Sequence, residues 1–93
     1  MGAMELQKRF RQWLEVEVGS AASPALRRHL AERDYRLYSC VEHAGSVQQE
    51  VYHPIRGFYR AAGRNEGEAL LGIMRQIWLI DAIAGAPATD HGA

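Results

Sequence analysis

The sequence contains a single cysteine, Cys40, so no disulfide bond can form within the chain. Small secreted domains usually depend on several disulfides, whereas free thiols persist in the reducing cytoplasm. The lack of a second cysteine therefore predicts a cytoplasmic protein. Cys40 and His43 stand near each other, but no second Cys-x-x-Cys or His pair completes a ligand set. We therefore expect no metal site and no bound cofactor.

A long apolar run is also missing. The most apolar stretch, from Ala69 to Ala84, is interrupted by Arg75 and Asp81. A membrane-spanning helix needs about 20 predominantly apolar residues. The stretch is too short and too charged for that role, so the sequence predicts no membrane association.

Neither sign of charge is in excess. The chain of 93 residues has 11 basic and 11 acidic side chains and a formal net charge of zero. Because nucleic-acid-binding domains usually carry a basic surplus, we expect no nucleic-acid partner. All basic residues except Lys8 are arginines, whose guanidinium groups suit bidentate contacts with carboxylates and phosphates. The length indicates one small domain with a modest core.

The spacing of apolar residues predicts an all-α fold. Apolar side chains recur at i, i+3 and i+4 in four segments that glycine and serine separate. The expected helices are 4–18, 24–44, 46–62 and 65–84. Short connections favour antiparallel neighbours, so the predicted fold is a compact antiparallel four-helix bundle. The domain is expected to span 4–85, after cloning remnants at 1–3 and before a flexible tail at 86–93.

Residues 35–55 also fit a second interpretation, an α+β fold with a β-hairpin. The tyrosines, valine and cysteine between Tyr35 and Glu42 suit a pleated strand, and Pro54 would kink a helix. We favour the helix because, in a hairpin, Gln49 and His53 would share a face with the valines. The hairpin at about 35–55 remains the alternative.

The expected helix at 65–84 is apolar on more than one side. Leu79 and Ile83 lie opposite its main apolar arc, beside Arg75. A helix with two apolar faces has to be covered on both, and three single-faced helices cover only one of them. This surplus predicts a contact with another protein or with a second copy of the chain.

Asp81 falls inside the main apolar arc, where an unpaired carboxylate is costly. We expect it to pair with a guanidinium, from Arg33, Arg36 or the Arg75 of a second copy. The predicted partner-binding or dimer interface consists of Arg75, Trp78, Leu79, Asp81 and Ile83. The sequence contains no catalytic constellation. The predicted function is therefore a small non-catalytic regulator or adaptor, of bacterial or phage type, that binds a partner protein as a homodimer.

A second hypothesis concerns a polar stripe on the expected helix 46–62. His53, Arg56 and Arg60 lie on this stripe and could form an anion or phosphoacceptor site. His53-Pro54-Ile55-Arg56-Gly57, with Gly63 at the right distance, partly resembles the motif of histidine phosphotransfer domains, which are four-helix bundles. The resemblance implies His53 as phosphoacceptor, Arg56 in the role of the motif's lysine, and Gly57 as the close-approach glycine.

Overall fold

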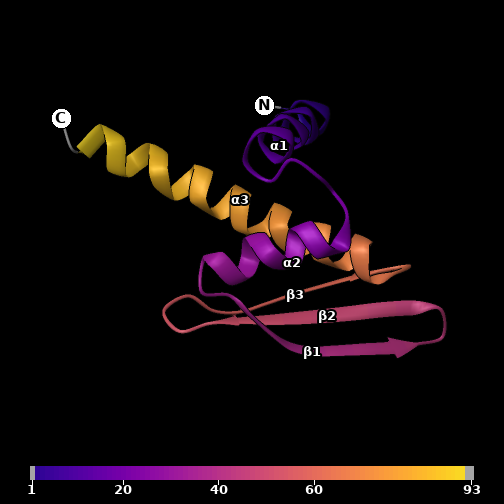
Figure 1. Ribbon diagram of the computed structural model, residues 1–93. Helices are drawn as coiled ribbons and strands as arrows, with labels where there is room; N and C mark the ends of the chain where they lie inside the picture. Colours follow the sequence, from indigo (N-terminus) through magenta and orange to yellow (C-terminus); the bar gives the residue numbers. More distant parts are fainter. Residues whose placement is uncertain (1, 92–93) are drawn as a thin grey trace.

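The computed structural model describes the backbone of residues 2–91 and the side chains of residues 2–84. Two helices precede three strands, and a long helix follows them (Figure 1). The elements are α1 (Ala3–Glu17), α2 (Ser23–Glu32), β1 (Arg36–His43), β2 (Ser46–His53), β3 (Gly57–Gly63) and α3 (Glu66–His91). The strands form one antiparallel sheet in the order β1-β2-β3.

The prediction of an all-α four-helix bundle is wrong, because residues 36–63 form a sheet. The α+β alternative with a hairpin at about 35–55 describes this region better. Asp34 has a φ of 68°, which ends α2 and turns the chain into β1. Ala44 and Gly45, at φ 52° and 78°, form the two-residue connection of the β1–β2 hairpin. Positive φ at both central residues gives the turn a twist that matches antiparallel strands.

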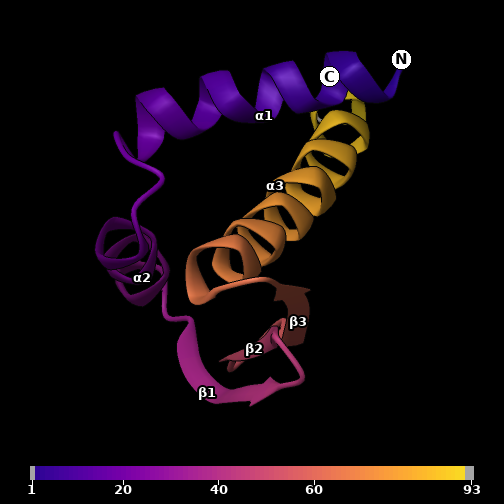
Figure 2. The same ribbon diagram turned by 90° about the vertical axis from the view of Figure 1, so that its right-hand side faces the viewer.

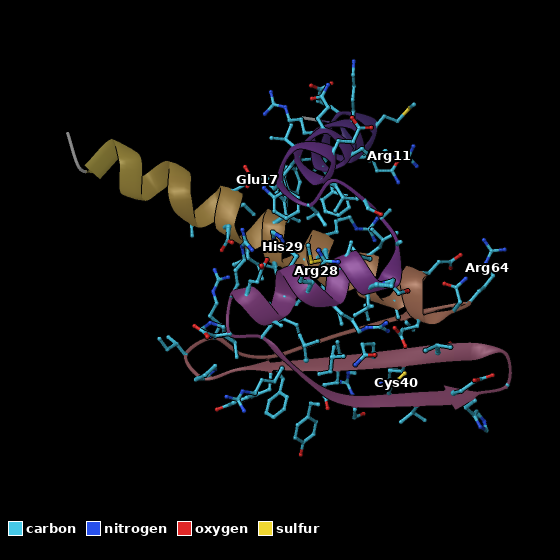
Figure 3. The ribbon with its side chains drawn as sticks, in the orientation of Figure 1. Arg11, Glu17, Arg28, His29, Cys40 and Arg64 are labelled. Atoms are coloured by element: carbon cyan, nitrogen blue, oxygen red, sulfur yellow. The ribbon has the colours of Figure 1, made fainter. Side chains whose placement is uncertain are left out.

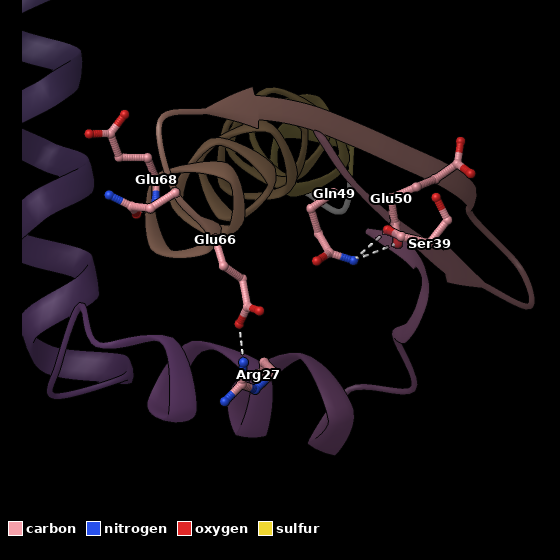
Figure 4. Close-up of polar contacts among 7 residues, drawn as sticks. Arg27, Ser39, Gln49, Glu50, Glu66 and Glu68 are labelled. Atoms are coloured by element: carbon pink, nitrogen blue, oxygen red, sulfur yellow. Dashed lines mark hydrogen bonds and ion pairs between the residues drawn. The ribbon is translucent and has the colours of Figure 1, made fainter. Parts of the chain in front are cut away.

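Gln49 is the residue whose polarity argues against the hairpin, and its surroundings explain why the hairpin forms. Its side chain faces the helices with Val47 and Val51, and only 2% of the residue is exposed. Its Nε2 donates hydrogen bonds to the carbonyl oxygens of Ser39, at 2.8 Å, and Glu50, at 3.1 Å (Figure 4). A buried amide is tolerated when its polar atoms have partners. Gln49 therefore occupies the core-facing side of β2.

The core lies between the sheet and the two helices α2 and α3, which cover the same face (Figure 2). Its most deeply buried side chains are Leu26, Leu30, Val51, Leu70, Ile73 and Met74. An ion pair between Arg27 and Glu66 joins α2 to the start of α3 (Figure 4). Within residues 2–91, none of the three helices covers the opposite face of the sheet (Figures 1 and 2). The sheet therefore has one packed face and one open face.

Helix α1 crosses over α3 on the side away from the sheet (Figure 2). The rings of Phe10 and Trp78 lie 5.7 Å apart, and the rings of Trp13 and His29 lie 5.6 Å apart. Aromatic pairs at such distances contribute about 0.5–1.5 kcal/mol beyond the area they bury. These contacts hold α1 onto α2 and α3.

Helix α3 begins close to its predicted position but ends later than expected. Asn65 Oδ1 accepts the Glu68 N–H at 2.9 Å, as predicted, while Glu68 Oε1 accepts the Arg64 N–H at 3.1 Å. The helix continues to His91, past the predicted end and through most of the expected tail. Residues 92–93 of that tail lie outside the described residues. No helix in the described part of the chain is long and apolar enough to cross a membrane.

Candidate functional site: a groove between α1, α3 and the edge of β3

The main hollow of the surface is an open groove of about 640 Å³. Helix α1 forms one wall, the edge of β3 contributes Ala62, and the outer side of α3 forms the floor. The floor and lower walls are apolar, mainly Phe10, Leu14 and Leu71. This volume lies within the roughly 300–1,000 Å³ of typical ligand sites.

The groove exists because α3 packs closely on β3, whereas α1 does not. At Gly72 of α3, an added Cβ would lie only 2.8 Å from the Cβ of Ala61 in β3. Only glycine permits this approach without a shift of the neighbouring chain. Helix α1 stands further from the sheet, because the rings of Phe10 and Trp78 lie between it and α3. The space between α1 and the strand edge stays open as a result.

Two guanidinium groups line the groove, Arg11 from α1 and Arg75 from α3 (Figure 3). Among residues 2–84, no carboxylate oxygen lies within 4.0 Å of either group. Of the two acids in the lining, Glu68 is paired with the Nε of Arg64 at 3.3 Å, and Glu15 lies on α1. The groove thus combines an apolar floor with two cations that are free to bind an anion.

The residues predicted as an interface on α3 do not share one surface. Arg75 lines the groove, and Trp78 packs against Phe10 of the same chain. Leu79 is half-buried, while Ile83 is 63% exposed. The predicted uncovered side of α3 is therefore present, but Trp78 belongs to the intramolecular packing.

Asp81 has a guanidinium partner, but a different one from those predicted. It pairs with Arg56 from the β2–β3 connection. Arg56 also donates from Nη1 to the hydroxyl oxygen of Tyr35 at 2.6 Å. The hydrogen bonds to Asp81 and Tyr35 raise the pKa of Arg56, and burial raises the pKa of Tyr35. Arg56 thus connects the strand loop to α3 and to the start of β1.

The predicted anion site of His53, Arg56 and Arg60 is not assembled. His53 Nδ1 accepts the N–H groups of Ile55 and Arg56, each at 3.1 Å, and its ring lies 4.7 Å from that of Tyr35. Arg60 pairs with Glu50 in the register of β2 and β3, which places its side chain on the open face of the sheet. The three side chains therefore do not converge on one ligand.

The helical bundle that the phosphotransfer resemblance implies is absent. His53 is the last residue of strand β2, and Gly57 opens β3 at a φ of 86°. Gly57 serves this turn instead of a close helix approach. Within the described residues, no group of three His, Cys, Asp or Glu side chains could hold a metal ion.

Sequence reasoning missed the contribution of α1 to the groove. Phe10 and Leu14 lie on the predicted apolar stripe and Arg11 on the predicted polar side, but nothing local places them opposite Arg75. No protein-family model matches the chain, and comparisons with curated proteins and with solved structures give no significant match. The function is therefore inferred from the site itself.

Proposed function

We propose that this chain is a non-catalytic module that binds a partner protein through the groove between α1 and α3 and acts as a homodimer. The observation that carries the proposal is the groove itself, with an apolar floor and two guanidiniums that have no carboxylate within 4.0 Å among residues 2–84. Arginine beside apolar and aromatic surface is a typical composition of protein-binding hot spots.

The chemistry of the groove selects one kind of occupant. Phe10, Leu14 and Leu71 offer contact to aliphatic or aromatic side chains, and burying such groups contributes about 25 cal/mol per Å². Arg11 and Arg75 offer bidentate hydrogen bonds to a carboxylate. A partner segment with apolar side chains and at least one Asp or Glu matches both features. An amphipathic helix laid into the groove would present them together.

The homodimer part of the proposal rests on α3 beyond the groove. Arg75, Leu79 and Ile83 follow one another at intervals of four, which places them on one side of the helix. Ile83 is 63% exposed and Ile80 is 44% exposed. A two-fold axis across this side of α3 would bury the same residues of both copies against each other. Cys40, free and exposed, supports a reducing compartment, for which we propose the cytoplasm.

Selection of peptides from a displayed library tests partner binding even though the partner has no name. We expect peptides selected on the wild-type protein to share apolar residues and an acidic residue. Arg75→Glu should weaken their binding at least about ten-fold, since loss of a charged hydrogen bond costs about 1.5–3 kcal/mol. Arg28→Glu is the matched control, because Arg28 is exposed on α2 and is not part of the groove lining. Equal losses for the two variants, or selected peptides without acidic residues, would refute the proposal.

Light scattering of the purified protein tests the dimer separately. The wild type should have twice the mass of the chain, and Ile83→Glu should convert it to a monomer. Val16→Glu is the control, because Val16 is also apolar and 81% exposed but lies near the end of α1. A monomeric wild type would remove the dimer from the proposal and leave partner binding in place.

A further inference from the structure

The open face of the sheet carries a cluster of three aromatic side chains. Phe58 of β3 lies at its centre, with its ring 4.9 Å from Tyr52 of β2 and 5.0 Å from Tyr38 of β1. Tyr38 is 65% exposed and Phe58 is 55% exposed. These rings point away from the core, since neighbouring Val51 is buried against the helices and successive strand residues alternate between faces. We call Tyr38, Tyr52 and Phe58 the aromatic platform.

Arginines flank the aromatic platform on both edge strands. Arg36 of β1 lies opposite Tyr52, and Arg60 of β3 lies two residues beyond Phe58 on the same face. Within the part of the chain whose side chains are described, neither guanidinium has a carboxylate within 4.0 Å. Glu50, opposite Arg60 in register, is the one acidic side chain that the strand register places on this face. The face therefore carries a small positive excess.

We propose that this open face binds single-stranded nucleic acid. Bases would stack on the aromatic platform, and Arg36 and Arg60 would contact the phosphates on either side. Base–aromatic stacking is worth about 1–3 kcal/mol per base, and exposed aromatics on a sheet with flanking cations suit it. The expectation of no nucleic-acid partner rests on the net charge of the whole chain, and that sum averages over faces that differ in charge.

The remaining composition of this face favours a nucleic acid over an apolar protein surface. Apart from the aromatic rings, Val41 is the only large apolar side chain that the register places there, and its neighbours include Ser46 and Gln48. A protein-binding face of this size would be expected to contain more aliphatic residues at its centre. Stacking with few hydrogen-bond donors at the centre also predicts little preference for base sequence.

Fluorescence anisotropy with labelled eight-nucleotide oligo-U and oligo-dT tests the proposal, with the full chain at low salt. We expect binding that Phe58→Ala and Phe58→Leu both weaken by about ten-fold or more, because each variant removes the central ring. Phe58→Leu keeps apolar bulk, and circular dichroism verifies the fold of both variants. Ile55→Ala, at a 90% exposed site on the adjacent loop, should leave affinity unchanged.

The charges give a second, independent readout. Two phosphate contacts predict a slope of log K against log salt of about −1.4, at about 0.7 per contact for single strands. Arg36→Ala should lower its magnitude by about half, and Glu50→Gln should strengthen binding. Tighter binding of oligo-U than of oligo-dT would identify RNA as the target, the reverse would identify DNA, and either supports the proposal.

Two results would overturn the inference. One is the absence of oligonucleotide binding by the folded protein, including the case in which the face instead binds a protein. The other is binding that Phe58→Leu leaves intact. Arg75→Glu in the groove should not change oligonucleotide affinity, so failure of this inference and failure of the proposed partner site can be told apart.

Discussion

Replacing Arg56 with alanine should destabilise the protein mainly through Tyr35 and only slightly through Asp81. Arg56 donates to the Tyr35 hydroxyl at 2.6 Å and pairs with Asp81. The side chain of Asp81 is 52% exposed, and an exposed ion pair contributes about 0–1 kcal/mol. Tyr35 is only 5% exposed, and a buried hydroxyl that loses its partner costs about 1–3 kcal/mol. We therefore expect Arg56→Ala to lower the free energy of unfolding by about 2 kcal/mol.

A double-mutant cycle measured by urea unfolding separates these two contributions. Asp81→Asn should cost less than about 1 kcal/mol. In a Tyr35→Phe background the hydroxyl is already absent, so Arg56→Ala should then also cost less than about 1 kcal/mol. Such a coupling between contacting residues is within the range that cycles detect. If Arg56→Ala costs the same with and without the hydroxyl, the assignment of its stabilising role to Tyr35 is wrong.

Two further predictions concern local packing and pH, and both are measured by chemical unfolding. Gly63→Ala should cost about 1–3 kcal/mol, because its Cβ would lie 2.5 Å from the Glu68 Cβ and 2.8 Å from the Ala69 nitrogen. Gly67→Ala, which meets only side-chain oxygens at 3.2 Å and beyond, should be neutral or stabilising by up to about 1 kcal/mol, and a larger loss there would contradict this packing. Burial, and then the charge of Arg33, lowers the pKa of His29 below its ordinary 6.5. The unfolded chain therefore binds more protons than the folded one below pH 6.5, so stability should fall as the pH drops from 6.5 towards the folded pKa. His29→Gln should flatten this decline, and an unchanged pH profile would exclude His29 as its cause.

The outer helices could be predicted from the sequence because their signals are local. Leu6, Phe10 and Leu14 repeat at the spacing of a helix face, and Asn65 with Glu68 marks the start of α3. Helix α1 and the start of α3 match the prediction within a few residues. The membrane prediction rested on an equally local pattern, the length of one apolar run.

The middle of the chain failed because its spacing fits two structures. Val47, Val51 and Ile55 recur every four residues, which suits one face of a helix and, equally, one face of a strand of period two. In the structure Val47 and Val51 are buried, but Ile55 is 90% exposed and Phe58 is 55% exposed. Only the tertiary contacts of Gln49 decide between the two interpretations.

The candidate site could be predicted only in part, for the same reason. Arg75 lies on the side of α3 that the sequence predicts to be uncovered, and it does line the groove. Its companion Arg11 lies 64 positions earlier in the sequence and joins it only when α1 crosses α3. The pairing of Asp81 with Arg56 likewise spans 25 positions, a separation that no local pattern encodes.

Amide chemical shifts of the full chain, followed while a peptide selected on the wild-type protein is added, test the central claim most directly. If the groove is the partner site, the largest changes will occur at residues lining it, such as Arg11, Leu71 and Arg75, and will be lost in Arg75→Glu. Changes centred on Phe58 and the open face of the sheet, or on no contiguous surface, would contradict the claim.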